Sequence, residues 1–145
     1  MTTQPPTMKY VVTADTKTDG QAAVQARTST IAFDGSAQAG ETLPGPADLL
    51  CAALSACILK NVERFSHMLP FRYHSASIEV TAEREEPPPR IVRMHYRLRI
   101  VTDEPTARLE LLHKNIRKFG TITNTLAAAC EVTGELEAVP AGGKS

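Results

Sequence analysis

The sequence predicts an α+β fold in which strands come first and a long helix, a hairpin, a second helix and a closing strand follow. Two stretches carry most of this prediction. Residues 47–67 are apolar enough for a helix that is covered on most sides, and residues 77–100 contain two runs that alternate apolar and polar side chains. The strands are not separated regularly by helices, so the order favours α+β over repeated β-α-β units.

The first third of the chain is typical of an antiparallel meander. MKYVVTAD (8–15) and QAAVQART (21–28) flank TKTDG, in which Asp19-Gly20 is a hairpin turn signal. STIAFDG (29–35) follows as a third strand, and the small residues and prolines of 36–48 predict a loop.

The predicted helix at 47–67 would be roughly 30 Å long. Its first half, Leu49 to Leu59, is apolar nearly all round, whereas its second half narrows to one apolar stripe before Pro70 stops it. A chain of 145 residues with one other sizeable helix has little to cover the first half on every side. We therefore expect Cys57, in the middle of this helix, to be mostly buried and close to a homodimer interface.

The strongest pattern predicts a half-buried antiparallel hairpin from SIEVTAE (77–83) and VRMHYRLRI (92–100). The apolar residues of both runs share one face, and the arginines and glutamates share the other, where we expect a solvated surface rather than a nucleic-acid or phosphate site. A turn over three prolines (87–89) predicts that Glu86 faces Arg90. The same register pairs Ile78 with Leu98, Glu79 with Arg97, Thr81 with His95 and Glu83 with Arg93.

The last third predicts a helix, a short helix and a strand. TARLELLHKNIRKF (106–119) has apolar residues at helical spacing, with Asp103 as its cap, Pro105 in its first turn and Gly120 at its end. TITNTLAAAC (121–130) begins a second, short helix, and EVTGELEAV (131–139) alternates as the closing strand.

Length and composition bound the class of protein. We expect a single domain over residues 1–145 with an ordered core at about 8–139. The 16 basic and 16 acidic residues balance, so no global field attracts nucleic acid or a membrane surface. The N-terminus lacks the pattern of a secretory signal, the longest apolar run is about half a membrane span, and three cysteines suit a reducing compartment. These features predict a cytoplasmic protein with reduced thiols.

Metal and cofactor motifs are missing from the sequence. The four histidines show no HExxH spacing, and there is no paired CxxC, GxGxxG, P-loop or GxSxG motif. We therefore expect no metal site and no bound cofactor.

The cysteines are the remaining candidates for chemistry. Cys51 and Cys57 are six residues apart, which is about 240° around a helix, so they cannot form a disulfide with each other. Cys130 lies at the end of the last helical stretch. Periodicity alone favours packing for all three, and we expect no intramolecular disulfide.

Two motifs resemble the OsmC/Ohr family. GPADLLCAALSACILKNVERF is similar to the family segment that leads a reactive cysteine into a central helix, and RKFGTITNTLAAACEVTGEL is similar to its "CPVSNTL" stretch. With the element order, the resemblance covers most of residues 9–139. It implies an OsmC-like fold, with antiparallel sheets packed around a long central helix in an intertwined homodimer. It also implies thiol-dependent hydroperoxide reduction and oxidative-stress defence.

The resemblance assigns the reactive, peroxidatic position to Cys57 and treats Cys51 as packing. The family's resolving cysteine falls on Gly120, so this chain resembles a divergent member without that thiol. A sulfenate on Cys57 would then have no programmed disulfide partner. Cys130 would offer a non-standard partner if its Cα lay within about 7 Å of that of Cys57.

The resemblance also implies an arginine and a glutamate that stabilise the thiolate of the reactive cysteine, and this chain has other residues at both positions. The family's helix-start glutamate falls on Ala47, and Asp48, the next residue, would point about 100° away. The family's arginine falls on Thr18, with Arg27 and Lys17 as looser candidates. An apolar environment disfavours a thiolate, and a threonine supplies no cation to reverse that effect.

Three hypotheses for function follow. In the first, the protein is a one-cysteine thiol peroxidase in which Cys57 reduces a small hydroperoxide and an external thiol restores it. In the second, it is a non-catalytic homodimer that binds a small lipophilic ligand near Cys57 or senses oxidants. In the third, it is an assembly module without a pocket. None of the three involves nucleic acid or a membrane.

Overall fold

The computed structural model describes residues 5–142 and contains three helices and two three-stranded sheets within them. The chain divides into two compact units, residues 1–49 and residues 50–145. The elements, in chain order, are β1 (Thr13–Thr16), β2 (Gln21–Ala26), β3 (Ser29–Asp34), α1 (Pro46–Met68), β4 (Ser75–Glu85), β5 (Arg90–Val101), α2 (Thr106–Phe119), α3 (Thr121–Ala127) and β6 (Glu131–Val139).

The first unit contains the predicted meander, with antiparallel strands in the order β1-β2-β3. The turn at Asp19-Gly20 closes as expected, because the amide of Gly20 donates to the carbonyl of Lys17 at 2.9 Å. The first strand is shorter than predicted and begins at Thr13. Thr13 pairs with Gln25, close to the end of β2, so residues 8–12 have no strand opposite them in this sheet.

The second unit contains the predicted hairpin, and its register is confirmed over most of its length. Ile78 is opposite Leu98, and Glu83 is opposite Arg93. The turn differs: a bulge between Glu83 and Arg84 shifts the pairing by one, so that Glu85, not Glu86, faces Arg90. Residues 87–89 are prolines and donate no amide hydrogens, so the ladder cannot continue to the tip in its original register.

Strand β6 pairs with β5 in a parallel direction, which corrects the expectation of purely antiparallel sheets. The physical reason is the connection. Helices α2 and α3 carry the chain from the end of β5 back to its start, which is the kind of crossover a parallel pair requires. The sheet β4-β5-β6 is therefore mixed.

Helices α1 and α2 lie within one residue of their predicted bounds, and α3 ends at Ala127, three residues before the end of the predicted stretch. The caps differ from the prediction. At the start of α1 the amide of Gly45 donates to Asp48 Oδ2 at 2.9 Å. At the start of α2 the capping residue is Pro105, without a side-chain cap, which corrects the prediction of Asp103. Asp103 Oδ1 instead accepts from the amide of Ala141 at 3.0 Å and so holds the segment after β6.

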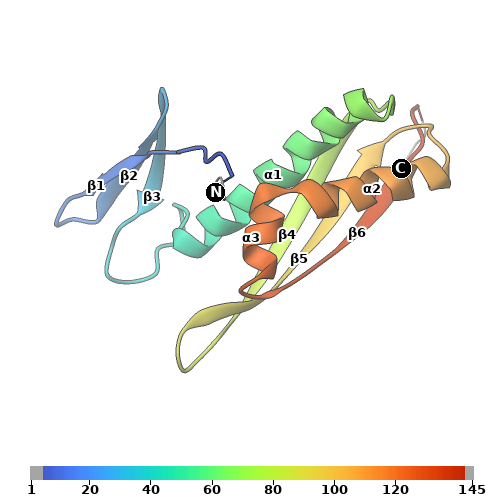
Figure 1. Cartoon of the computed structure of the whole chain (residues 1–145). Helices are drawn as coiled ribbons and strands as arrows, with labels where there is room; N and C mark the ends of the chain where they lie inside the picture. Colours follow the sequence, from blue (N-terminus) through green and yellow to red (C-terminus); the bar gives the residue numbers. More distant parts are fainter. Residues whose placement is uncertain (1–4, 143–145) are drawn as a thin grey trace, which may run out of the picture. The chain divides into compact units, whose positions relative to one another are not determined.

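The core of the second unit lies where the helices cover one face of the sheet β4-β5-β6 (Figure 1). Helix α1 and helix α2 present their apolar stripes to the apolar face of β5, as the alternation predicted. No helix within residues 5–142 is long and apolar enough to cross a membrane. The core residues are Leu54, Ile58, Val62, Phe65, Phe71, Met94, Tyr96, Leu98, Ile100, Leu109, Leu112 and Ile116.

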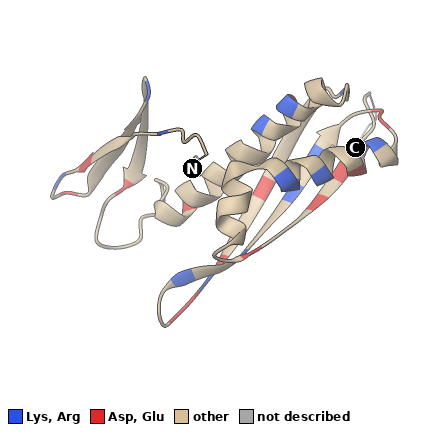
Figure 2. Ribbon diagram, viewed as in Figure 1, with Lys and Arg blue, Asp and Glu red and all other residues tan. Residues whose placement is uncertain are grey.

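The outer face of the same sheet carries a ladder of opposite charges, and Figure 2 shows segments of both signs on neighbouring strands. Arg93 lies between Glu83 and Glu131, and its Nε is 2.6 Å from Glu83 Oε2. Arg97 lies in the same way between a glutamate of β4 and Glu135 of β6. These arginines are exposed, which confirms the face assignment.

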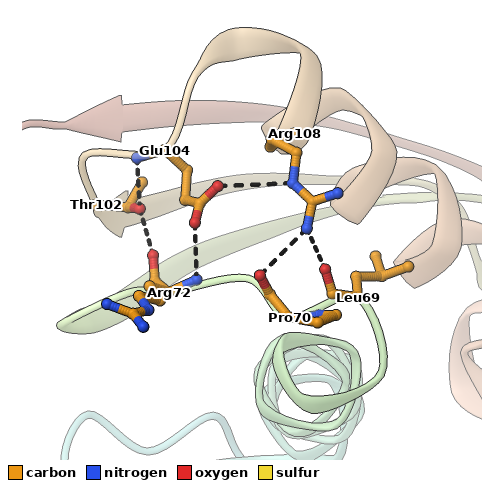
Figure 3. A network of polar contacts seen from close by, with 6 residues as sticks. All are labelled: Leu69, Pro70, Arg72, Thr102, Glu104 and Arg108. Carbon is orange, nitrogen blue, oxygen red and sulfur yellow. Dashed lines mark hydrogen bonds and ion pairs between the residues drawn. The ribbon is translucent and has the colours of Figure 1, made fainter.

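A polar network ties the end of α1 to the start of α2 (Figure 3). The Arg108 guanidinium donates to the carbonyls of Leu69 and Pro70 and lies 3.6 Å from a Glu104 carboxylate oxygen. The other Glu104 oxygen accepts from the amide of Arg72 at 3.2 Å. This network satisfies carbonyls just past the end of α1 that have no helical partner.

Candidate functional site

Cys57 lies in the middle of α1, at the edge of the stripe that faces the core. It is about 60° around the helix from Leu54 and about 40° from Asn61. Both of those neighbours are buried, whereas Cys57 is half-buried. The predicted position in the middle of the helix is confirmed, whereas Cys57, predicted to be mostly buried, is half-buried in the described chain.

The sulfur of Cys57 has a neutral partner one helical turn further along α1. Asn61 Nδ2 lies 3.7 Å from Cys57 Sγ and donates to the backbone carbonyl of Cys57 at 3.0 Å. The Asn61 side chain is almost fully buried, with 7% of the residue exposed. Asn61 was not predicted from the sequence, although a polar residue inside an apolar stripe was a visible signal.

Cys51, Cys57 and Cys130 form no disulfide with one another. Cys51 packs against the core, which confirms its structural role. Cys130 also packs against the core, and its Sγ donates to the carbonyl of Leu126 at 3.4 Å. A Cα distance of at most about 7 Å between Cys130 and Cys57 stays the condition for a non-standard dithiol mechanism.

Gly120, the position of the family's resolving cysteine, is buried in the short connection between α2 and α3. A Cβ added there would lie 2.8 Å from Thr123 Oγ1 and 3.1 Å from the carbonyl oxygen of Ile116. Thr123 is also buried, and its hydroxyl has no hydrogen-bond partner within residues 5–142. The space that a side chain at position 120 would need is therefore already occupied by Thr123.

The positions that correspond to the family's arginine and glutamate lie in the first unit. Thr18 is exposed in the β1–β2 turn, and Arg27 is exposed in the β2–β3 turn with a φ of 55°. Lys17 precedes Thr18 in the same turn and is exposed. Ala47 is exposed in the first turn of α1, where the next residue, Asp48, is engaged in the cap described above.

The family model described as "OsmC-like protein" matches residues 38–135, which include α1, the hairpin, α2, α3 and most of β6. The chain belongs to the OsmC-like family. The resemblance seen in the two motifs is thus confirmed. No curated protein matches the chain in sequence.

Solved structures support the OsmC-like fold over nearly the whole chain. An OsmC-like protein from Mycoplasma pneumoniae superposes with a TM-score of 0.80 at 17% identity, covering 92% of this chain and 98% of that one. An organic hydroperoxide resistance protein OsmC from Legionella pneumophila gives 0.69 at 12% identity, with coverage of 90% and 99%. The organic hydroperoxide resistance protein OhrB of Bacillus subtilis gives 0.65 at 18%, with coverage of 90% and 98%. At these identities the likeness shows the fold.

A second polar cluster of this OsmC-like chain joins β5 to α2, and sequence reasoning missed it. The hydroxyl of Tyr96, which is fully buried, lies 2.6 Å from His113 Nε2, and the two rings meet edge to face. Burial, followed by the charge of Arg117, lowers the pKa of His113. Burial raises the pKa of Tyr96. Both groups are therefore held in their neutral forms.

A hollow of about 700 Å³ lies next to the network of Figure 3 and is lined by Phe71, Arg72, Tyr73 and Glu104 among others. Tyr73 donates to Glu63, and this hydrogen bond raises the pKa of Tyr73 to about 12. Within residues 5–142, no group of three or more histidine, cysteine or acidic side chains could hold a metal ion. Cys57 remains the candidate nucleophile.

Proposed function

We propose that this OsmC-like protein is a thiol protein of oxidative-stress defence in which Cys57 reduces a small hydroperoxide. The observation that carries the proposal is a half-buried free thiol in the middle of α1, within the matched family segment, whose sulfur faces the amide of Asn61. Two proteins of the same fold, from Legionella pneumophila and Bacillus subtilis, are named organic hydroperoxide resistance proteins.

The reaction follows from the chemistry of a thiolate. The Cys57 sulfur attacks the outer oxygen of R–O–O–H, the O–O bond breaks, and the sulfur becomes a sulfenic acid. The leaving alkoxide takes up a proton and departs as the alcohol. Sulfur is oxidised by two electrons and the hydroperoxide is reduced by the same two.

Recycling is proposed to use an external thiol. Position 120 carries no thiol, and Thr123 fills the space beside it. An external thiol would attack the sulfenic acid, form a mixed disulfide with Cys57 and release water. A second thiol would then release Cys57 in its reduced form and leave as the oxidised disulfide. The protein would therefore turn over as a one-cysteine peroxidase.

The proposed assembly is a homodimer. Residues 8–12 expose a run of large apolar side chains without strand partners, and Ile31 and Leu43 are also exposed. Large exposed apolar groups of this kind mark interaction surfaces. Sedimentation at micromolar concentration is expected to give a dimer, and a monomer would contradict this assembly.

The alternative is a protein that senses oxidants or binds a small lipophilic molecule without turnover. One observation favours it: the partner found for the Cys57 sulfur is an uncharged amide, where a fast peroxidase needs a well-stabilised thiolate. In this case Cys57 would react once with peroxide and would not be recycled.

Stopped-flow mixing with cumene hydroperoxide separates these two functions. Fully reduced protein is expected to consume hydroperoxide at many equivalents when a small dithiol is supplied, and Cys57→Ser is expected to abolish consumption. Cys51→Ser, a matched change about 1.7 turns away on the same helix, should leave the rate unchanged. Consumption of a single equivalent would support the sensor, and none at all would contradict the redox role.

Mass spectrometry after mild peroxide treatment tests the remaining route. The one-cysteine mechanism predicts oxidised Cys57 or its adduct with an added thiol. A Cys57–Cys130 crosslink would show instead that Cys130 acts as an internal resolving thiol.

A further inference from the structure

Asn61 occupies a position in α1 where an apolar residue is expected. It lies in the buried stripe with Ile58, Val62 and Phe65, and 7% of the residue is exposed. A buried amide loses its hydrogen bonds to water, which costs free energy unless the protein provides partners. The polar atoms of the Asn61 side chain therefore need hydrogen-bond partners within the protein.

The amide of Asn61 reaches back by one turn to a single residue. Its Nδ2 donates to the Cys57 carbonyl at 3.0 Å and lies 3.7 Å from Cys57 Sγ, within hydrogen-bond range for sulfur. The hydrogen bond of one N–H to the carbonyl fixes the amide, and the other N–H is then available to the sulfur. An N–H donor favours the charged form of an acidic group, because it stabilises a thiolate more than a thiol.

We propose that Asn61 is a positioning residue for Cys57, which holds the sulfur in one orientation and stabilises its thiolate with a neutral hydrogen-bond donor. The catalytic relevance of this inference rests on the proposed function, whereas the effect on the thiol can be measured without any peroxide. The chain thus uses an amide from the same helix to favour the thiolate.

The charged side chains of α1 close to Cys57 are exposed or are bonded to other groups. On α1, Lys60 is exposed, and Glu63 accepts hydrogen bonds from Tyr73 and His67. The β5 residues packed against α1 are apolar, because the arginines of β5 point to the opposite face of the sheet.

The charged groups of α2 are likewise engaged. The imidazole of His113 is bonded to Tyr96, and Arg117 donates to the carbonyl of Val132 at 3.4 Å. The partner found for the Cys57 sulfur within residues 5–142 is therefore Asn61.

A purely local role for Asn61 is the competing explanation, and the chain supplies a control for it. Asn115 on α2 makes the same backward hydrogen bond, from its Nδ2 to the carbonyl of Leu111 at 2.8 Å. Asparagine often bonds to the backbone in this way. Asn115→Leu therefore removes a similar contact in a helix without affecting a thiol.

The test measures the pH profile of Cys57 alkylation by iodoacetamide in a Cys51→Ala, Cys130→Ala background. With Asn61→Leu, we expect the pH midpoint of alkylation to rise and the alkylation rate at pH values below the midpoint to fall about threefold to tenfold. The loss of a weak hydrogen bond to a charged group implies a change of this size. Asn115→Leu should leave the midpoint where it is. Asn61→Ser, which is smaller and keeps a donor, covers the case in which Asn61→Leu does not fold, and should give an intermediate midpoint.

Unchanged midpoints in folded Asn61→Leu and Asn61→Ser would overturn the inference and leave Asn61 as a backbone-bonding residue. Hydroperoxide consumption by the parent protein is measured separately. A shifted midpoint in a protein that consumes no hydroperoxide would support the role of Asn61 and contradict the proposed function. Hydroperoxide consumption with unchanged midpoints would support the proposed function and contradict the role of Asn61.

Discussion

Gly134→Ala should be one of the most destabilising single-methyl additions in the second unit. Gly134 lies in β6 directly opposite Tyr96 of β5, and the phenol ring covers the glycine. A Cβ at this position would stand 2.0, 2.2 and 2.3 Å from three carbons of the Tyr96 ring. Carbon atoms pack favourably at about 3.5–4.0 Å, so the ring or the strand would have to move by more than about 1 Å.

Tyr96 has no easy way to move. It is fully buried, and its hydroxyl is held 2.6 Å from His113 Nε2. Overpacking a core by a methyl group costs about 1–3 kcal/mol, and we expect about 3 kcal/mol or more here because both ends of the ring are constrained. A typical domain has about 5–15 kcal/mol of total stability, so the variant would lose a large share of it.

Urea unfolding followed by circular dichroism measures this loss. Gly45→Ala is the matched control, because its Cβ would have no heavy atom nearer than Asp48 Oδ2 at 3.8 Å. The control changes a helix cap and should cost no more than about 1 kcal/mol. Adding Tyr96→Leu to Gly134→Ala should recover part of the loss. A Gly134→Ala protein as stable as the Gly45→Ala control would refute this account of the contact.

Three further predictions concern polar groups. Thr123→Val should stabilise the protein by about 1 kcal/mol or more in chemical denaturation, because it replaces a buried unpaired hydroxyl with a methyl group; a lower unfolding midpoint would show that the hydroxyl is bonded. Arg108→Ala should cost about 2 kcal/mol, and Arg108→Lys should recover only part, because an ammonium cannot bridge two carbonyls as a guanidinium does. Burial, followed by the charge of Arg117, lowers the pKa of His113 in the folded protein. The stabilisation that neutral His113 provides is therefore complete above its pKa in the unfolded chain, about 6.5, and is lost as the pH falls below that value. His113→Gln should flatten the dependence of the urea midpoint on pH in this range, and an unchanged slope would contradict it.

The hairpin could be predicted from the sequence because its two faces differ so clearly. A slip of one residue would have buried Arg97 and exposed Leu98, so alternation excluded odd shifts. The place of the proline turn then selected the register that is found from Ile78 to Glu83. The register changes at the proline turn, where side-chain pattern carries little information. Helix bounds were also predictable, because apolar spacing and the terminating residues agree at both ends of α1 and α2.

The direction of β6 and the partners of single polar groups were not predictable. An alternating strand looks the same in parallel and antiparallel pairs, so the direction of β6 depended on where α2 and α3 returned the chain. The contact between Tyr96 and His113, and that between Asn61 and Cys57, depend on side-chain position rather than on periodicity. For the candidate site, the sequence identified the cysteine but not the amide beside it.

The charge ladder on the outer face of β4-β5-β6 also affects how copies of this sheet can meet. Strands β4 and β6 form its two edges, and Arg93 and Arg97 of β5 each lie between a glutamate of β4 and a glutamate of β6. The edges therefore keep an excess of negative charge, with Glu79 and Glu83 on one and Glu131 and Glu135 on the other. Like charges placed directly opposite each other repel, so two such edges resist joining into a longer sheet. The side chains that keep three strands in register thus also protect the protein against uncontrolled edge-to-edge aggregation.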